Sequence, residues 1–174
     1  MRNKSSAQFI IVCEDKQQDV FARRFLKFSK INRHNIYTKR CRNPKTTGDA
    51  KDWIRKNLPD QLQGFRSYTR KNKSTARILI VITDADDKTV EQRIKHITSE
   101  CNPTPNSNEN VCFIIPKWAI ETWIMYLRDG QADESYKIQK KDRLKEEGLC
   151  LDHVKKLKDM CDSDSLPQDA IDSL

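Results

Sequence analysis

The chain has 174 residues, of which 36% are hydrophobic and 33% are charged, and its formal net charge is +8. This length favours a single domain with a substantial core beneath a heavily charged surface. No apolar run reaches the length of a membrane span, and no signal-peptide core precedes the first apolar segment, so we expect a cytoplasmic protein without a membrane anchor.

The positive charge is concentrated between Arg23 and Arg77, where 17 Lys and Arg accompany 3 Asp and no Glu. Solvated surfaces usually mix both signs, whereas a one-sided basic segment is typical of proteins that bind a phosphate backbone. We therefore predict nucleic acid, DNA or RNA, as the partner. The expected contacts come from seven cations: Arg40, Arg42, Lys45, Arg66, Arg70, Lys71 and Lys73.

The six cysteines form no C-x-x-C pair, and Cys13 and Cys112 fall in predicted buried strands. Because structural zinc sites usually pair their cysteines at such short spacing, the pattern argues against zinc. We expect free thiols in a reducing compartment.

The first predicted strand is the apolar run 8–13, which Glu14 follows directly. A helix is predicted from there to about residue 29, because phenylalanines recur on one helical face: Phe21, Phe25 and Phe28. Residues 35–40 favour a second strand through their β-branched and aromatic side chains.

Asp49 can cap a further helix, and Pro59 is expected to help end it. The segment 61–75 is polar and basic without clear periodicity, so we predict a mobile loop there.

The run 77–82 is apolar and largely β-branched, which predicts a strand buried on both faces. Carboxylates follow at Asp84, Asp86 and Asp87, and the two in Asp-x-Asp spacing would share a face on a continuing strand. Alternatively, these acids cap the next helix, predicted over 88–99 with three inward residues: Val90, Ile94 and Ile97.

Another buried strand is predicted over 111–115, and a helix over 117–127 opens directly from it. Lys117 and Glu121 lie near the start of that helix. After a break at Gly130, the remaining chain is expected to be helical and peripheral, with one apolar stripe: Leu151, Val154, Leu157 and Cys161.

Strands that alternate with helices predict an α/β fold with a mainly parallel sheet flanked by helices. Since the carboxyl ends of parallel strands share one edge, four acids should gather there: Glu14, Asp84, Asp86 and Glu121. Uncompensated carboxylates repel one another, and a divalent cation is the simplest compensation. Lys117 would lie near the same edge, although an ordinary surface lysine explains it equally well.

Three blocks together resemble the Toprim family, and in particular its OLD-like (overcoming lysogenization defect) and phage-defence nucleases: residues 12–19 (VCEDKQQD), 80–87 (IVITDADD) and 115–123 (IPKWAIETW). The resemblance implies a Toprim-like, Rossmann-like domain over residues 7–128 and a helical extension over 129–174 packed on it. One departure is Asp15, which stands where Toprim proteins usually have glycine.

The resemblance implies a metal-dependent nuclease in which Asp84 and Asp86 hold Mg²⁺ or Mn²⁺. Glu14 would act as general acid/base or as a second ligand, Glu121 would complete a second site, and Lys117 would steady the phosphate charge. It also suggests a phage-defence setting, a partner ATPase and a possible homodimer. The alternatives are a nucleic-acid-binding module that has lost catalysis and a module that binds a protein partner.

Overall fold

Four parallel strands form the centre of the computed structural model, which describes residues 7–42, 47–132 and 150–163. Their order across the sheet is β2-β1-β3-β4. The strands are β1 Gln8–Cys13, β2 Ile36–Arg40, β3 Arg77–Ile82 and β4 Val111–Ile114. The helices are α1 Lys16–Phe28, α2 Thr47–Lys71, α3 Val90–Ile97, α4 Ile120–Asp129 and α5 Cys150–Asp162, with a short 3-10 turn at Arg33–Asn35. This Rossmann-like α/β arrangement confirms the predicted fold class.

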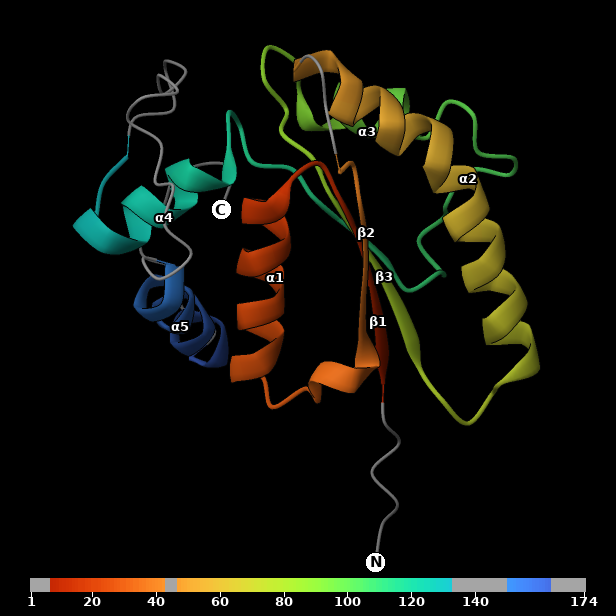
Figure 1. Ribbon diagram of the computed structural model, residues 1–174, viewed down its shortest axis with the longest axis horizontal. Coiled ribbons are helices and arrows are strands. Elements are labelled where there is room, and N and C mark those ends of the chain that lie inside the picture. Colours follow the sequence, from red (N-terminus) through yellow and green to blue (C-terminus); the bar gives the residue numbers. More distant parts are fainter. Residues whose placement is uncertain (1–6, 43–46, 133–149, 164–174) are drawn as a thin grey trace, which may run out of the picture.

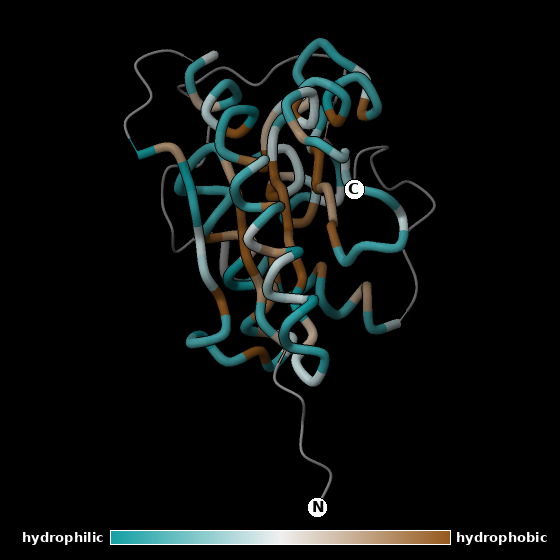
Figure 2. Tube along the Cα trace, turned by 90° about the vertical axis from the view of Figure 1, so that its right-hand side faces the viewer, coloured by the Kyte–Doolittle hydropathy of each residue, from teal (hydrophilic) through white to brown (hydrophobic). Residues whose placement is uncertain are grey.

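Helices cover both faces of the sheet, with α1, α4 and α5 on one side and α2 and α3 on the other (Figure 1). Alternate residues of a strand point to opposite faces, so each strand feeds two cores. Ile11 and Ile80 pack on the α1 side, whereas Val12 and Val81 pack with Leu58 of α2. Figure 2 shows the hydrophobic strands enclosed by helices whose outer residues are hydrophilic.

Helix α2 continues through Pro59 to Lys71, so the predicted helix end and the loop over 61–75 are wrong. Proline inside a helix costs roughly 3 kcal/mol. Burial of each large apolar side chain contributes about 1.5–3 kcal/mol, which outweighs that cost. The buried stripe runs across the proline at helical spacing: Ile54, Leu58, Leu62 and Phe65.

Several smaller expectations also fail. Val90 is 42% exposed at the first turn of α3, and Arg93 is buried instead. Cys112 and Cys161 are exposed, although both were assigned to buried positions; with Cys13, Cys41 and Cys101 they are free thiols. Helix α4 begins at Ile120 rather than at residue 117.

Helix α5 packs on α1 and α4, where Val154 and Leu157 join Phe21 and Ile124 in one core. The helical predictions for residues 133–149 and 164–174 lie outside the described residues. Within the described ranges, no helix combines the length and apolarity that crossing a membrane requires.

Candidate active site

The register between β1 and β3 brings the first two acidic motifs together. Cys13 pairs with Ile82, so Glu14 emerges beside Thr83 at the carboxyl edge of the sheet. Because β2 and β3 lie on opposite sides of β1, the carboxyl end of β1 is the switch point at which open α/β sheets bind their ligands. By alternation Glu14 points toward the α2 side and Asp84 toward the α1 side.

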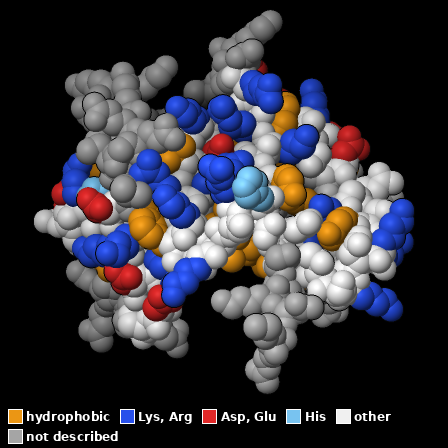
Figure 3. Space-filling view, turned by 60° about the horizontal axis from the view of Figure 1, so that its bottom comes forward, with side chains coloured by type: hydrophobic (Ala, Val, Ile, Leu, Met, Phe, Trp, Pro, Cys, Tyr) orange, Lys and Arg blue, Asp and Glu red, His pale blue; other side chains and the backbone are white. Residues whose placement is uncertain are grey.

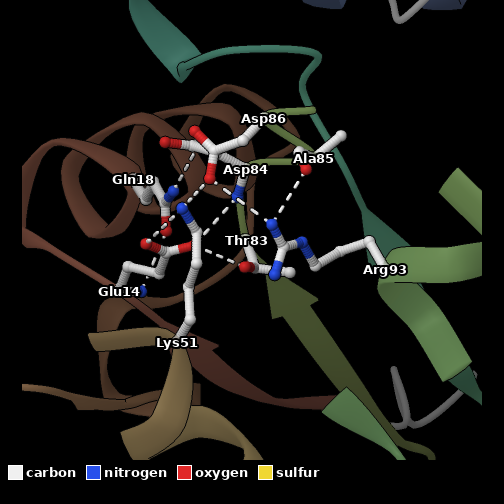
Figure 4. A network of polar contacts seen from close by, with 8 residues as sticks. All are labelled: Glu14, Gln18, Lys51, Thr83, Asp84, Ala85, Asp86 and Arg93. Carbon is white, nitrogen blue, oxygen red and sulfur yellow. Dashed lines mark hydrogen bonds and ion pairs between the residues drawn. The ribbon is translucent and has the colours of Figure 1, made fainter. Parts of the chain in front are cut away.

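Glu14 is 7% exposed and is held by the loop after β3 (Figure 4). Its Oε1 accepts hydrogen bonds from the Thr83 hydroxyl and from the Asp84 backbone N–H at 2.9 Å. The Glu14 backbone N–H donates to Gln18 Oε1 at 2.9 Å. Burial raises the pKa of Glu14, although the nearby Lys51 ammonium and the hydrogen bonds from Thr83 and the Asp84 backbone lower it.

Asp84 is the second member of this pair. Its Oδ1 accepts from Gln18 Nε2 at 2.9 Å, which ties the loop to α1. Burial raises the pKa of Asp84 well above its ordinary value; the charges of Glu14, Asp15 and Glu121 raise it further, and Lys51 opposes them. Both neighbouring carboxyl groups therefore resist ionisation. Such a pair tends to retain a proton, and a bound cation would stabilise its ionised form.

Two cations already reach the cluster from the helices on the α2 side. Lys51 Nζ forms an ion pair with Asp86 Oδ2 and lies 4.0 Å from Glu14 Oε2. Arg93 donates to the Ala85 carbonyl at 2.8 Å and lies 3.4 Å from Asp86 Oδ2. The acidic edge is therefore partly compensated by the protein itself, which the sequence interpretation did not foresee.

The Asp-x-Asp segment does not continue as a regular strand. The chain stays extended alongside the exit of β4, where the Ala85 N–H donates to the Pro116 carbonyl at 2.7 Å. It then turns at Asp86, whose φ is 54°. Asp and Asn tolerate this left-handed conformation better than most residues, so the position suits an aspartate.

Glu121 and Lys117 come from the chain after β4. Glu121 is 7% exposed in the first turn of α4, near enough for its charge to raise the pKa of Asp84. Lys117 lies with its Nζ 5.6 Å from the centroid of the Trp118 ring. The structure thus joins Glu121 electrostatically to the acidic pair, while the described contact of Lys117 is with an aromatic ring.

The acidic edge offers carboxylate oxygens as donors for a metal ion. Among the described residues, no group of three His, Cys, Asp or Glu side chains forms a ready metal cage. Within the same residues, no hydrogen bond reaches Glu14 Oε2 or Asp84 Oδ2. Two such hard oxygens fit Mg²⁺ or Mn²⁺, because Mg²⁺ commonly takes one or two carboxylates and completes its shell with water and phosphate oxygens.

The predicted nucleic-acid contacts divide between opposite ends of the fold. Arg40 ends β2 and Arg42 follows it, both at the acidic edge. Arg66, Arg70 and Lys71 lie on the last turns of α2, and Lys73 follows that helix. The span from Lys51 to Lys71 is about 30 Å at the usual rise of an α-helix. Lys45 lies outside the described residues.

A second basic surface lies between α1 and the start of β2 and includes Arg24, Lys27 and Arg33. Figure 3 shows Lys and Arg side chains gathered on the lower side of the view in Figure 1. The sequence count included these residues, but the list of predicted contacts did not.

Arg66 has a structural role at its end of α2. It bonds to Glu109 at 2.5 and 2.8 Å and to the Pro103 carbonyl at 2.9 Å.

Arg66→Ala is expected to lower the free energy of unfolding by about 2 kcal/mol, measured by urea denaturation. The exposed Arg70→Ala is the matched control, and equal losses in both variants would contradict this role. Because the Arg66 hydrogen bond lowers the pKa of Glu109, the contribution is present at neutral pH and disappears as the carboxylate is protonated in acid.

Asp15 occupies its position without glycine geometry. Its φ is −139° and its ψ is −177°, an extended conformation open to any residue. Its carboxylate caps α1 by accepting from the Gln18 N–H at 2.9 Å. The departure from the Toprim pattern therefore carries no backbone strain.

Sequence reasoning missed Gln18, Lys51, Thr83 and Arg93. Gln18 lies one helical turn after Glu14, a spacing that could have indicated it. Lys51 could have been found because α2 begins at the edge where β2 ends. Arg93 was not among the residues expected to face inward on its helix, which were Val90, Ile94 and Ile97. Searches against protein-family models and curated proteins find no match to this chain.

Proposed function

We propose that this chain is a divalent-metal-dependent nuclease that hydrolyses phosphodiester bonds of DNA or RNA, as its resemblance to Toprim proteins suggests. The observation that carries the proposal is the pair Glu14 and Asp84 at the switch point. Burial and neighbouring acids raise the pKa of both carboxyl groups. Each group also keeps one oxygen without a hydrogen bond among the described residues.

In this proposal Glu14 and Asp84 offer the first two oxygen ligands, and Asp86 joins them when its contact with Lys51 opens. A bound Mg²⁺ or Mn²⁺ would polarise the phosphoryl oxygen and supply a nucleophilic water. Gln18 and Thr83 orient the carboxylates. Burial raises the pKa of Glu14, which favours a carboxyl group that can hold a proton and return it during the reaction. Lys51 supplies positive charge beside the scissile phosphate.

The second candidate function is a nucleic-acid-binding module without catalysis. It is favoured by Lys51 and Arg93, whose contacts with Asp86 already compensate part of the negative charge. The two candidates differ in their need for metal: binding by a module of this kind would continue unchanged in EDTA.

Cytoplasmic localisation, a phage-defence role, a partner ATPase and a homodimer belong to the same proposal. They rest on the family resemblance and, for the compartment, on the free thiols.

Cleavage assays test the proposal with single- and double-stranded DNA and RNA, each with Mg²⁺, Mn²⁺ or EDTA. We expect metal-dependent cleavage that Glu14→Gln reduces by about a hundredfold or more, as expected for loss of a general acid/base. Glu109→Gln is the control for the same chemical change, at the far end of α2. Equal cleavage by wild type and Glu14→Gln would remove Glu14 from the mechanism.

A further inference from the structure

A cavity of about 730 Å³ lies beside the acidic edge, around the end of β2. Its walls come from three elements and the segment after β2: Asp19 and Arg23 of α1, Thr38, Lys39 and Arg40 of β2, Arg42, and Trp53 of α2. In the register of the sheet Arg40 pairs with Cys13, the residue directly before Glu14. Since adjacent strands are about 4.8 Å apart, the cavity adjoins the proposed active site.

The cations of this cavity are of two kinds. Arg23 is committed to the protein, because it bonds to Asp19 and Thr38 at 2.6 Å each. The side chains of Lys39, Arg40 and Arg42 have no hydrogen bond or ion pair with any described residue. Three such cations around one hollow favour an anionic ligand, and arginine is well shaped to bind phosphate oxygens.

Trp53 adds an aromatic wall. It is half-buried, packs against the core on the α2 side, and also lines the cavity. Core packing holds its ring, which reduces the entropy cost of placing a base on it. Aromatic rings beside cations are the usual means of binding unstacked bases. A base in a duplex stays stacked on its neighbours and cannot lie against such a wall.

We propose that this cavity binds one nucleotide unit of single-stranded nucleic acid, with the base against Trp53 and the phosphate at Arg40 and Arg42. The strand then continues over the end of β1 toward Glu14 and Asp84. The substrate of the proposed nuclease would then be single-stranded. Binding of the strand does not depend on the proposed nuclease activity, whereas cleavage of the bound strand does.

Binding is measured by fluorescence anisotropy with a labelled 12-nucleotide single strand in EDTA, in the Asp84→Asn background, so that cleavage plays no part. Arg40→Gln/Arg42→Gln should reduce the slope of log K against log salt by about 0.7, the value for one phosphate neutralised on a single strand. Lys95→Gln/Lys155→Gln makes the same charge change at exposed positions of α3 and α5 and should leave the slope within about 0.3 of its starting value. Equal reductions in the two variants would overturn the assignment.

Trp53→Leu keeps an apolar side chain against the core but removes the aromatic face. It should weaken single-strand binding by about tenfold, and Trp53→Phe should recover most of that loss. Circular dichroism and the thermal midpoint establish that each variant is folded. Identical affinities in the folded Leu and Phe variants would overturn the stacking contact.

Two further binding measurements distinguish a single strand from a duplex and from a free nucleotide. A duplex of the same sequence should bind at least about tenfold more weakly than the single strand, because its bases stay stacked. A mononucleotide that binds as tightly as the 12-mer would assign the cavity to a free nucleotide and overturn the strand assignment. If the Arg40/Arg42 and Trp53 variants weaken binding as expected but the wild type shows no metal-dependent cleavage, only the nuclease proposal is contradicted. The failure of that proposal can therefore be told apart from a failure of the cavity assignment.

Discussion

Replacing Asp84 with Asn is expected to reduce metal-dependent cleavage by about a thousandfold or more, since loss of a metal ligand removes several kcal/mol of transition-state stabilisation. The same change should stabilise the metal-free protein. Burial and neighbouring acids raise the pKa of Asp84 in the folded state. The unfolded side chain ionises near pH 4, so above that pH the folded state holds a proton that the unfolded state has released.

The raised pKa of Asp84 makes the free energy of unfolding depend on pH. Wherever the folded state binds more protons, the free energy of unfolding falls as pH rises. In EDTA, Asp84→Asn should therefore gain stability over wild type from about pH 4 upward and show little difference below it. Urea denaturation at several pH values measures this. Asp87→Asn, an exposed neighbour with the same chemical change, is the control. A variant that cleaves normally, or is less stable than wild type at pH 8, would contradict the role given to Asp84.

Lys51→Met is expected to destabilise the metal-free protein by about 3 kcal/mol or more, because it leaves buried carboxylates without their cation. Lys51 is 14% exposed at its side chain and lies between Glu14 and Asp86, which are 9% and 16% exposed. Methionine keeps most of the apolar stem, so the loss reports the charge rather than the packing.

Magnesium gives this prediction its specific readout. If a divalent ion occupies the same acidic edge, Mg²⁺ should raise the stability of Lys51→Met more than that of wild type, because no ammonium competes with it. Lys56→Met, at an exposed position on the same helix, should respond to Mg²⁺ as wild type does. A Lys51→Met protein that unfolds at the same urea concentration as wild type would show that the lysine does not balance the carboxylates.

Strand positions could be predicted because they depend on local apolar runs. The runs 8–13 and 77–82 match β1 and β3 residue for residue. Since both strands are parallel and adjacent, their following acids, Glu14 and Asp84, meet as expected. Helix α2 was missed beyond Pro59 because a local breaker was given more weight than the apolar spacing on either side of it.

The cations of the site could not be predicted from the motifs. Lys51 and Arg93 lie on helices far from the acids in sequence, and only the way α2 and α3 pack brings them to Asp86. Charge counting identified a basic segment but could not distinguish Arg66, which is bound to Glu109, from Arg40 and Arg42, which line a cavity.

Metal binding at this edge of the sheet can be measured by calorimetric titration of Mn²⁺ into wild type and Asp84→Asn/Asp86→Asn, with a single-stranded oligonucleotide carrying non-hydrolysable linkages present in both. Asn is chosen at residue 86 because it tolerates the φ of 54° found there. We expect saturable Mn²⁺ binding to wild type and its loss in the double variant. Equal binding in both proteins, or none in wild type, would contradict a metal-dependent active site at this edge of the sheet.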